Sequence, residues 1–291
     1  MFKKVTIIGP GLIGASIGMA LRTRKLAAQV VGVGRRKASL DNALKVGALD
    51  KATLDLKEGV QKAELVVLAT PISTIVEMVP RLPEMLDAEA LLTDVASAKV
   101  RVIEVVSSAM RFRPDVSYIP SHPMAGSEKS GALAARADLF VGAVCILTPL
   151  TNTFPESKGR IVQMWRELGA RVVSMTPQAH DRLVARISHV PHLAAAALLA
   201  NLEESELPLC GGGLKDTTRI AGGDADLWLD ICRENREEVR AALEAYIALL
   251  RKTADSLRTS DLGPLRDLLR NARNKRDKLL GAAEGPRPPR Q

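Results

Sequence analysis

The sequence feature that most constrains the fold is a glycine turn that follows a short apolar run near the N-terminus. Residues 5–8 (VTII) have the length and the β-branched side chains expected of a buried parallel strand. They lead into Gly9-Pro10-Gly11-Leu12-Ile13-Gly14, which fits the pattern G-x-G-x-x-G and is followed by helix-forming and small residues. Strand, glycine turn and helix in this order predict a Rossmann-type dinucleotide-binding unit.

Each glycine of this turn has its own expected role. Gly9 permits the tight turn, Gly11 lets the backbone approach a pyrophosphate, and Gly14 lets the helix pack closely on the strand. Leu12 and Ile13 stand where the helix begins, and its free N–H groups and positive dipole end suit phosphates. We therefore expect this turn to bind the cofactor, with a glycine-rich turn that holds no ligand as the alternative.

The loop after the second predicted strand, residues 29–33, indicates which dinucleotide is bound. NAD-binding units place an acidic residue about 20 residues beyond the glycines, where it holds the ribose 2′-hydroxyl. Here residues 34–39 read GRRKAS, beginning with Gly34 and Arg35, and contain no carboxylate. Arg35 can form charge-assisted bonds to a 2′-phosphate, with Arg36 beside it and the Ser39 hydroxyl nearby. The loop predicts NADP over NAD, with a solvated basic loop as the alternative.

Further apolar runs alternate with helical patterns and predict a right-handed, mostly parallel sheet of α/β class. The predicted strands cover residues 65–68, 91–94, 116–119, 145–148 and 171–174. The first of these ends at Thr70-Pro71, a turn that we expect to face the cofactor. The second leads into a loop of small polar residues that includes Ser97. Loops at the carboxyl ends of parallel strands meet at one edge of the sheet, where open α/β folds place their ligands.

A histidine lies where the strand pattern gives way to helical periodicity. Residues 119–131 read IPSHPMAGSEKSG, which places His122 in a turn rich in Pro and Gly. Since histidine titrates near neutral pH, His122 is a candidate for exchanging a proton with a substrate. A solvated or capping loop histidine is the alternative for this residue taken alone.

Thr176 and Pro177 mark the predicted boundary between two domains. Thr176 can cap a helix that has Pro177 at its first position. We expect a dinucleotide-binding domain over residues 1–176 and an all-helical domain over residues 177–280, with Pro191 kinking or interrupting the first long helix. Residues 281–291, rich in Gly, Pro and Arg, are expected to be disordered.

The helical domain should contain further long helices over residues 226–250 and 262–280. Residues 193–202 are apolar on most faces. A helix of this kind is buried, either inside its domain or against a second subunit.

Composition narrows the possible partners and compartments. The three cysteines stand far apart without a C-x-x-C pair, which argues against a disulfide framework or a zinc site and favours a reducing, cytoplasmic compartment. We expect no secretory leader and no membrane span, which requires about 20 apolar residues.

The net charge of +8 is concentrated near the C-terminus, where seven Lys or Arg residues from Arg270 onward face only Asp277 and Glu284. Aromatic residues make up 3% of the chain, which leaves few for stacking on bases. A solvated helix end or tail is therefore favoured over nucleic-acid binding.

With these segments in view, the chain resembles the prephenate and arogenate dehydrogenase family of tyrosine biosynthesis, from about residue 5 to residue 280. The resemblance is carried by the glycine turn and, in order, by TDVASAK at 93–99, SHPMAG at 121–126, SHVPH at 188–192 and KDTTRIA at 215–221. It implies a Rossmann-type domain followed by a helical domain that forms a homodimer. The loop at residues 34–36 is similar to that of the NADP-using members.

The resemblance implies oxidative decarboxylation, either of prephenate to 4-hydroxyphenylpyruvate or of arogenate to tyrosine. A hydride passes to the nicotinamide, the hydroxyl proton passes to a base, and carbon dioxide leaves as the ring becomes aromatic. By this resemblance His122 bonds the ring hydroxyl and Ser97 hydrogen-bonds His122 near the nicotinamide. Arg219 clamps a substrate carboxylate, for which a bidentate guanidinium is chemically suited.

Other residues receive roles from the resemblance alone. His189 and Ser127 would line the substrate pocket, and Glu128 and Asp216 would lie near the arginine, holding it or gating entry. His180 and His192 match less well. The alternatives are an interior histidine for His189 and a structural salt bridge between Asp216 and Arg219.

Two other functions are compatible with parts of the pattern. Another two-domain NADP dehydrogenase, such as a β-hydroxyacid or imine reductase, would share the first domain and a helical second domain. A non-catalytic NADP-binding protein would need the glycine turn but not Ser97, His122 and Arg219 together. The sequence leaves the choice between prephenate and arogenate open, and NADP use favours arogenate slightly.

Overall fold

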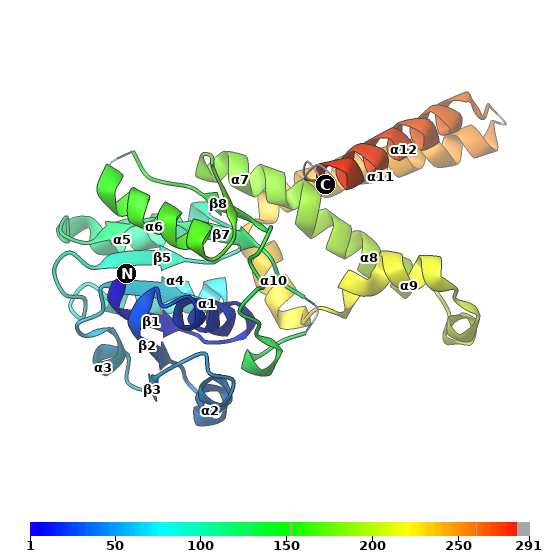
Figure 1. The fold of residues 1–291 in the computed structure, drawn as a ribbon. Coiled ribbons are helices and arrows are strands. Elements are labelled where there is room, and N and C mark those ends of the chain that lie inside the picture. Colours follow the sequence, from blue (N-terminus) through cyan, green and yellow to red (C-terminus); the bar gives the residue numbers. More distant parts are fainter. Residues whose placement is uncertain (128, 152, 260, 284–291) are drawn as a thin grey trace, which may run out of the picture. The chain divides into compact units, whose positions relative to one another are not determined.

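The computed structural model describes residues 1–127, 129–151, 153–259 and 261–283, and its chain forms two compact units, Met1–Val239 and Arg240–Gln291 (Figure 1). The first unit is built on a six-stranded parallel sheet with the order β3-β2-β1-β4-β5-β6. This is the strand order of a Rossmann-type doubly wound sheet. The predicted fold class is therefore confirmed.

The elements of the first unit follow the predicted strands and helices closely. The sheet strands are β1 (Phe2–Ile8), β2 (Ala27–Val33), β3 (Lys51–Thr53), β4 (Leu65–Leu68), β5 (Leu91–Asp94) and β6 (Ser117–Tyr118). The helices are α1 (Leu12–Thr23), α2 (Lys37–Lys45), α3 (Leu56–Val60), α4 (Ile72–Met78), α5 (Val100–Ala109), α6 (Pro155–Glu167), α7 (Pro177–Val184), α8 (Val190–Ala200), α9 (Gly212–Thr218) and α10 (Ala225–Glu234). Strand β3 was not predicted, because this short edge strand has no apolar run.

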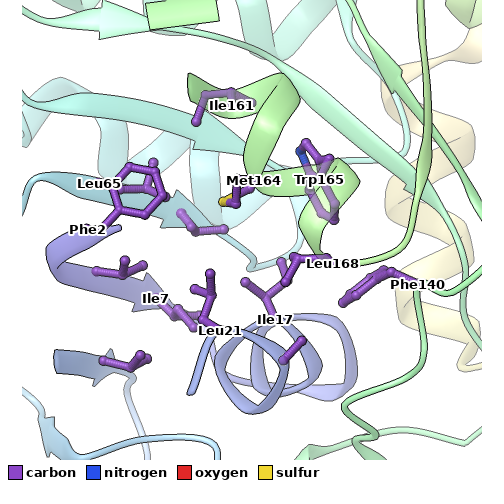
Figure 2. Close-up of a cluster of buried hydrophobic side chains, with 14 of the residues drawn as sticks. Phe2, Ile7, Ile17, Leu21, Leu65, Phe140, Ile161, Met164, Trp165 and Leu168 are labelled. Carbon is purple, nitrogen blue, oxygen red and sulfur yellow. The ribbon is translucent and has the colours of Figure 1, made fainter. Parts of the chain in front are cut away.

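The strands are apolar throughout because helices cover both faces of the sheet. Leu65 belongs to one core, with residues of α1 and α6, whereas its neighbour Val66 belongs to the other, with residues of α4 and α5. Figure 2 shows the first core, where Phe140 and Trp165 meet edge to face with ring centroids 5.3 Å apart. The indole Nε1 of Trp165 donates a hydrogen bond to Oγ of Ser121 over 3.1 Å, which ties this core to the next strand, β7 (Ser121–Met124).

A second, three-stranded sheet follows the main one, with the order β7-β8-β9. Its strands are β7 (Ser121–Met124), β8 (Val144–Leu147) and β9 (Arg171–Ser174), and β7 runs antiparallel to β8. The positions of β8 and β9 were predicted, but their separation from the main sheet was not. Strand β7 begins three residues after β6 and carries His122.

A long helical segment begins at Pro177, where Oγ1 of Thr176 accepts a hydrogen bond from the amide of Ala179 over 3.2 Å. The predicted cap is confirmed. The predicted domain boundary at this point stays a prediction. In the structure, α7 to α10 belong to the same compact unit as the sheets. The expected kink at Pro191 takes the form of a π-helical turn over Ala185–His189, after which α8 continues. Proline lacks the amide hydrogen of a regular helical bond, and a π-turn accommodates the missing bond.

The helical segment Pro177–Ala200 has a mean hydropathy of 1.4 and is long and apolar enough, by length and composition alone, to cross a membrane. No segment of this kind was expected from the sequence. However, its buried polar side chains His180 and Asp181 hydrogen-bond residues of β7 and α5. These contacts attach the first part of the segment to the sheets, but only a third of the segment is buried. Within residues 193–200 only Ala195 is buried, so the expectation that this stretch is buried inside its domain is wrong.

The predicted helix over residues 226–250 is interrupted. Helix α10 ends at Glu234, and α11 runs from Arg236 to Arg258. Between them, the buried side chain of Asn235 donates a hydrogen bond to the backbone carbonyl of Asp181 over 2.9 Å. Asparagine favours such breaks because its amide bonds the backbone outside a helix.

The second unit contains the greater part of α11 and helix α12 (Gly263–Ala283). Residues 281–283 were predicted to belong to a disordered tail, but the structure includes them in α12. The helix-favouring pair at residues 282–283 extends the helix beyond Gly281. The rest of the predicted tail, residues 284–291, lies outside the described residues.

Candidate active site

All four histidines of the chain are buried, and they lie in one region where β7 meets the segment from α7 to α8. His122 comes from β7, His180 from α7, His189 from the end of the π-helical turn and His192 from α8. The rings of His122 and His180 have centroids 5.0 Å apart. The sequence singled out His122 and His189, whereas the other two matched less well.

A chain of hydrogen bonds runs from His122 to a buried carboxylate. Nδ1 of His122 lies 2.8 Å from Nε2 of His180, and Nδ1 of His180 lies 2.7 Å from Oδ1 of Asp181. The same carboxylate accepts hydrogen bonds from the amides of Lys99 (2.8 Å) and Val100 (2.9 Å). These amides lie at the N-terminus of α5, where a negative charge is stabilised by the helix dipole. Asp181 was missed because nothing in the sequence pairs it with a segment some 80 residues away.

The hydrogen bond predicted between Ser97 and His122 is not formed among the described residues. Ser97 is half-buried in the loop after β5, and Nδ1 of His122 is bonded to His180 instead. Helix α7 places a second imidazole, that of His180, against Nδ1 of His122, which the sequence pattern could not reveal. The other ring nitrogen of His122, Nε2, bonds no residue in the part of the chain that the structure describes.

A buried ion pair holds the segments on either side of this chain. The ammonium of Lys99 contacts the carboxylate of Asp94 and donates to the carbonyl of Ser121 over 2.7 Å. The hydroxyl of Tyr118 donates to Oδ2 of Asp94 over 2.7 Å. Lys99 and Asp94 are fully buried, so each charge needs the other. Because Ser121 precedes His122, this network fixes the start of β7 and thereby the backbone of His122.

Burial keeps these histidines neutral. It is the largest cause that sets the pKa of His122 well below its usual range, and nearby His180, Lys99 and His189 lower it further. Burial likewise lowers the pKa of His189 to about 4, although the negative charge of Asp181 opposes this effect. The pKa of His180 is also lowered, mainly by burial. At pH 7 these rings are therefore neutral imidazoles able to accept a proton.

The predicted carboxylate clamp, Arg219, lies on a segment packed against α8. Arg219 is exposed at the end of α9, and the short segment that it begins, Arg219–Gly222, packs against α8, which carries His192. His192 stacks on Trp228 with ring centroids 3.5 Å apart and an interplanar angle of 13°. Trp228 also meets His189 edge to face at 6.1 Å. Trp228 and His192 are thus candidate pocket residues that the sequence did not bring forward.

The remaining predicted substrate residues lie outside this buried cluster. Asp216 is exposed on α9. Ser127 is exposed in the loop after β7, and its Oγ accepts a hydrogen bond from the amide of Lys129 over 3.1 Å. Glu128 lies outside the described residues. The contacts described for Asp216 and Ser127 do not bring either to His122.

The glycine turn has the geometry that was predicted for it. Gly9 adopts φ +85°, which favours glycine. A Cβ on Gly14 would lie 2.6 Å from the carbonyl oxygen of Gly9, so only glycine lets the helix approach this closely. A Cβ on Gly11 would meet nothing within 4 Å, which leaves open space over the turn. The amides of the first turn of α1, at residues 12–14, have no partner within the helix and are available to a phosphate.

The turn after β4 completes this cradle. Thr70 lies against the glycine turn, since a Cβ on Gly9 would be 2.5 Å from its Cγ2. Its Oγ1 is buried and has no hydrogen-bond partner among the described residues. Pro71 follows at the N-cap of α4. An unsatisfied hydroxyl beside open space and free amides fits a bound dinucleotide.

The loop after β2 presents basic side chains to solvent. Arg35 and Arg36 are exposed, and neither forms an ion pair with a described residue. The Gly34 amide bonds the carbonyl of Thr53 on β3 over 3.4 Å, which holds the loop at the carboxyl end of β2. Ser39 is half-buried in the first turn of α2. Both guanidinium groups are therefore free to meet a phosphate.

Comparison with known proteins agrees with this geometry. The family model for the prephenate dehydrogenase nucleotide-binding domain matches residues 17–174, and the model for the prephenate dehydrogenase dimerization domain matches residues 176–271. The prephenate dehydrogenase of Bacillus subtilis is 31% identical over 286 residues, which cover 96% of this chain and 76% of that relative.

Two solved structures are also similar along nearly their whole length. The prephenate dehydrogenase of Aquifex aeolicus, in complex with hydroxyphenyl propionate and NAD+, has a TM-score of 0.88 and 28% identity over 96% of this chain and 99% of its own. Synechocystis arogenate dehydrogenase has a TM-score of 0.78 and 31% identity over 95% of this chain and 99% of its own.

The buried ion pair makes a prediction about stability. Replacing Lys99 by Met should lower the free energy of unfolding by about 3–5 kcal/mol, because Asp94 is then left as a buried charge without its cation. Arg136→Met is the matched control, since the Arg136–Asp138 pair is exposed and should matter little. Urea unfolding followed by tryptophan fluorescence measures both variants. Equal losses in the two variants would contradict the structural role of the buried pair.

The lowered pKa of His189 makes a prediction about pH. Between pH 6.5 and about 4 the unfolded chain binds a proton at this residue that the folded chain does not. The free energy of unfolding should therefore fall as pH is lowered through this window, by about 3 kcal/mol from this residue. A His189→Gln variant removes the titrating group and should show a correspondingly flatter dependence. Identical slopes for the variant and the unchanged protein would show that His189 is not buried in the neutral form.

Proposed function

The chain belongs to the prephenate dehydrogenase family, and we propose that it uses NADP to oxidise and decarboxylate prephenate or arogenate, with His122 as the base. The observation that carries the proposal is the buried neutral imidazole of His122, which lies four residues beyond the carboxyl end of β6 with Nε2 free. That is the edge of the sheet at which the glycine turn lies. A base and a dinucleotide cradle at one edge suit a dehydrogenase.

The proposed reaction asks the protein for a proton acceptor and for substrate positioning. The bound nicotinamide supplies the chemistry of accepting a hydride from the ring carbinol carbon. Nε2 of His122 accepts the proton of the same carbon's hydroxyl group. The bond to the ring carboxylate breaks, carbon dioxide leaves, and the electron pair of that bond enters the ring, so that the ring oxygen becomes a phenolate. The phenolate takes the proton back from Nε2 of His122 and becomes the product hydroxyl. Because the ring becomes aromatic, His122 needs only to hold the oxygen, accept its proton and return it.

The substrate carries two carboxylates, and we assign one of them to Arg219. A guanidinium can bind a carboxylate through two parallel hydrogen bonds, which fixes orientation as well as charge. The packing of the segment Arg219–Gly222 on α8 keeps the backbone of this arginine close to the helix that carries His192. His189 is proposed to line the pocket behind the substrate. Ser127, Glu128 and Asp216 keep the roles that the resemblance gave them.

We propose NADP rather than NAD as the preferred cofactor. Arg35 and Arg36 are exposed at the carboxyl end of β2, where the ribose of a dinucleotide lies in this fold. The loop offers no carboxylate to repel a 2′-phosphate, and Ser39 adds a hydroxyl in the first turn of α2. Ser97 is retained as a residue near the nicotinamide, although it does not bond His122.

We also propose that the protein is a cytoplasmic homodimer, joined through its helical part. Residues 176–271 match the dimerization domain of the family. Large apolar side chains are exposed on α11 and α12, among them Leu249, Leu257, Leu269 and Leu279. Apolar surface of this kind marks protein interfaces.

Replacing His122 by Asn should lower kcat by about 10²–10⁴-fold, because the positioned base is removed. The measurement is NADPH formation at 340 nm with prephenate and, separately, with arogenate. NADPH affinity, measured by fluorescence titration, is the control and should not change, because the glycine turn is left intact. Turnover near that of the unchanged enzyme would remove His122 from the mechanism.

Replacing Arg35 by Ala should raise the KM for NADP about tenfold or more, because a hydrogen bond to a charged group is worth about 1.5–3 kcal/mol. The KM for NAD should change little, since NAD has no 2′-phosphate. Lys45→Ala, which removes an exposed positive charge from the far end of α2, is the matched control and should affect neither constant. A clear preference of the unchanged enzyme for NAD would overturn the cofactor assignment.

A further inference from the structure

We propose that Asp181, acting through His180, is a positioning residue that fixes the tautomer of His122 and makes Nε2 the proton-accepting atom. The inference rests on the proposed function, because it concerns the same histidine. It goes further by assigning the hydrogens of the whole chain, and it gives a role to two residues that the mechanism above leaves unused.

The assignment follows from the groups that can donate. An ionised carboxylate only accepts hydrogen bonds, so Nδ1 of His180, 2.7 Å from Oδ1 of Asp181, must carry a hydrogen. A neutral imidazole carries one hydrogen, which leaves Nε2 of His180 with a lone pair. That nitrogen lies 2.8 Å from Nδ1 of His122, so Nδ1 of His122 must donate to it. Nε2 of His122 is then the nitrogen that holds the lone pair.

Asp181 is held in place by several hydrogen bonds, which keeps the direction of donation from His122 through His180 to Asp181 from reversing. Its two carboxylate oxygens accept the amides of Lys99 and Val100, and its backbone carbonyl accepts the side-chain amide of Asn235. With Nδ1 of His180 the carboxylate has three donors, and it cannot turn away from His180 without leaving the amides of Lys99 and Val100 unpaired. An unpaired buried donor costs about 1–3 kcal/mol, which opposes such a rotation.

The charged and titratable groups around His122 favour the same state. Lys99 on the loop before α5, with its ion-pair partner Asp94, and His189 at the end of the π-helical turn lie close enough to influence His122 or His180. Burial, and next to it the neighbouring groups that include Lys99, disfavour a positive charge on His122, so its ring rests neutral. When its Nε2 accepts the hydroxyl proton, the O–H bond of the substrate breaks and the N–H bond forms. Nδ1 keeps its hydrogen bond to His180, and Asp181 stabilises the new positive charge without receiving the proton, as carboxylates behind catalytic histidines do.

The tautomer can be measured without substrate or cofactor. Ring ¹⁵N NMR of the histidine-labelled full-length protein distinguishes a protonated from an unprotonated ring nitrogen. The chain has only four histidines, so single replacements of His180, His189 and His192 assign the spectrum. At neutral pH we expect His122 to carry its hydrogen on Nδ1 and none on Nε2. A hydrogen on Nε2 of His122 in the unchanged protein would overturn the proposal.

Kinetics provide the second test, with a matched pair of variants at one position. His180→Leu removes the acceptor of the His122 Nδ1 hydrogen, and kcat should fall at least tenfold while KM values for substrate and NADP change little. His180→Gln offers a carboxamide oxygen in its place and should recover part of the loss. The acid limb of the kcat/KM profile should move to lower pH in His180→Leu, because protonated His122 loses its acceptor. A purely structural residue would lower thermal stability in both variants and leave this limb in place.

The outcomes separate the two levels of the proposal. If the unchanged enzyme turns over neither prephenate nor arogenate, the proposed function fails, whatever the tautomer. A second outcome is that the enzyme turns over one of these substrates and that its turnover depends on His122. If His180→Leu and His180→Gln then have the same kcat and the same acid limb of the kcat/KM profile, the proposed function stands and the positioning role of His180 and Asp181 fails.

Discussion

The arrangement of the histidine site depends on one constraint: each buried charge beside it must have an ion-pair or hydrogen-bond partner. Asp181 and Lys99 are buried, and a buried charge is costly unless it is paired and hydrogen-bonded. Each satisfies this need through segments distant in sequence: Asp181 through the start of α5 and His180, Lys99 through Asp94 and the carbonyl of Ser121. The position of His122 on β7 follows from these bonds, because it lies between the two networks.

The cofactor cradle depends on backbone geometry rather than on charge. A parallel sheet of the observed order brings the turns after β1, β2 and β4 to one edge. Close contact between Gly9, Gly14 and Thr70 shapes the first turn, and the free amides of α1 face open space above Gly11. Specificity for the 2′-phosphate is then left to two exposed arginines on a separate loop. The cradle and its specificity can therefore vary independently.

The sequence predicted the parts of the fold that local patterns determine. The glycine turn, the four-residue strands β4 and β5 and the cap at Thr176 are each set by residues close together in the chain, and the structure agrees with them. The bond between His122 and His180 could not be predicted in this way. It joins residues 58 positions apart, and it depends on how α7 is rotated against β7.

The same limit explains the errors. Ser97 was paired with His122 by resemblance, but the hydrogen bond that His122 forms in the structure joins its Nδ1 to His180 on α7. The break at Asn235 depends on a bond to Asp181, a residue of another helix, and helical periodicity alone does not reveal it. In each case a polar side chain is satisfied by a distant partner, which sequence spacing does not encode.

The most direct measurement is a crystal structure of the enzyme with NADP and the aromatic product, 4-hydroxyphenylpyruvate or tyrosine. The product hydroxyl should lie within hydrogen-bond distance, about 2.6–3.2 Å, of Nε2 of His122. Its carboxylate should be bound by Arg219, and the reactive carbon of the nicotinamide should face the ring carbon that carries the hydroxyl. A product hydroxyl bound away from His122, or a nicotinamide on the other side of the sheet edge, would contradict the assignment of His122 as the base.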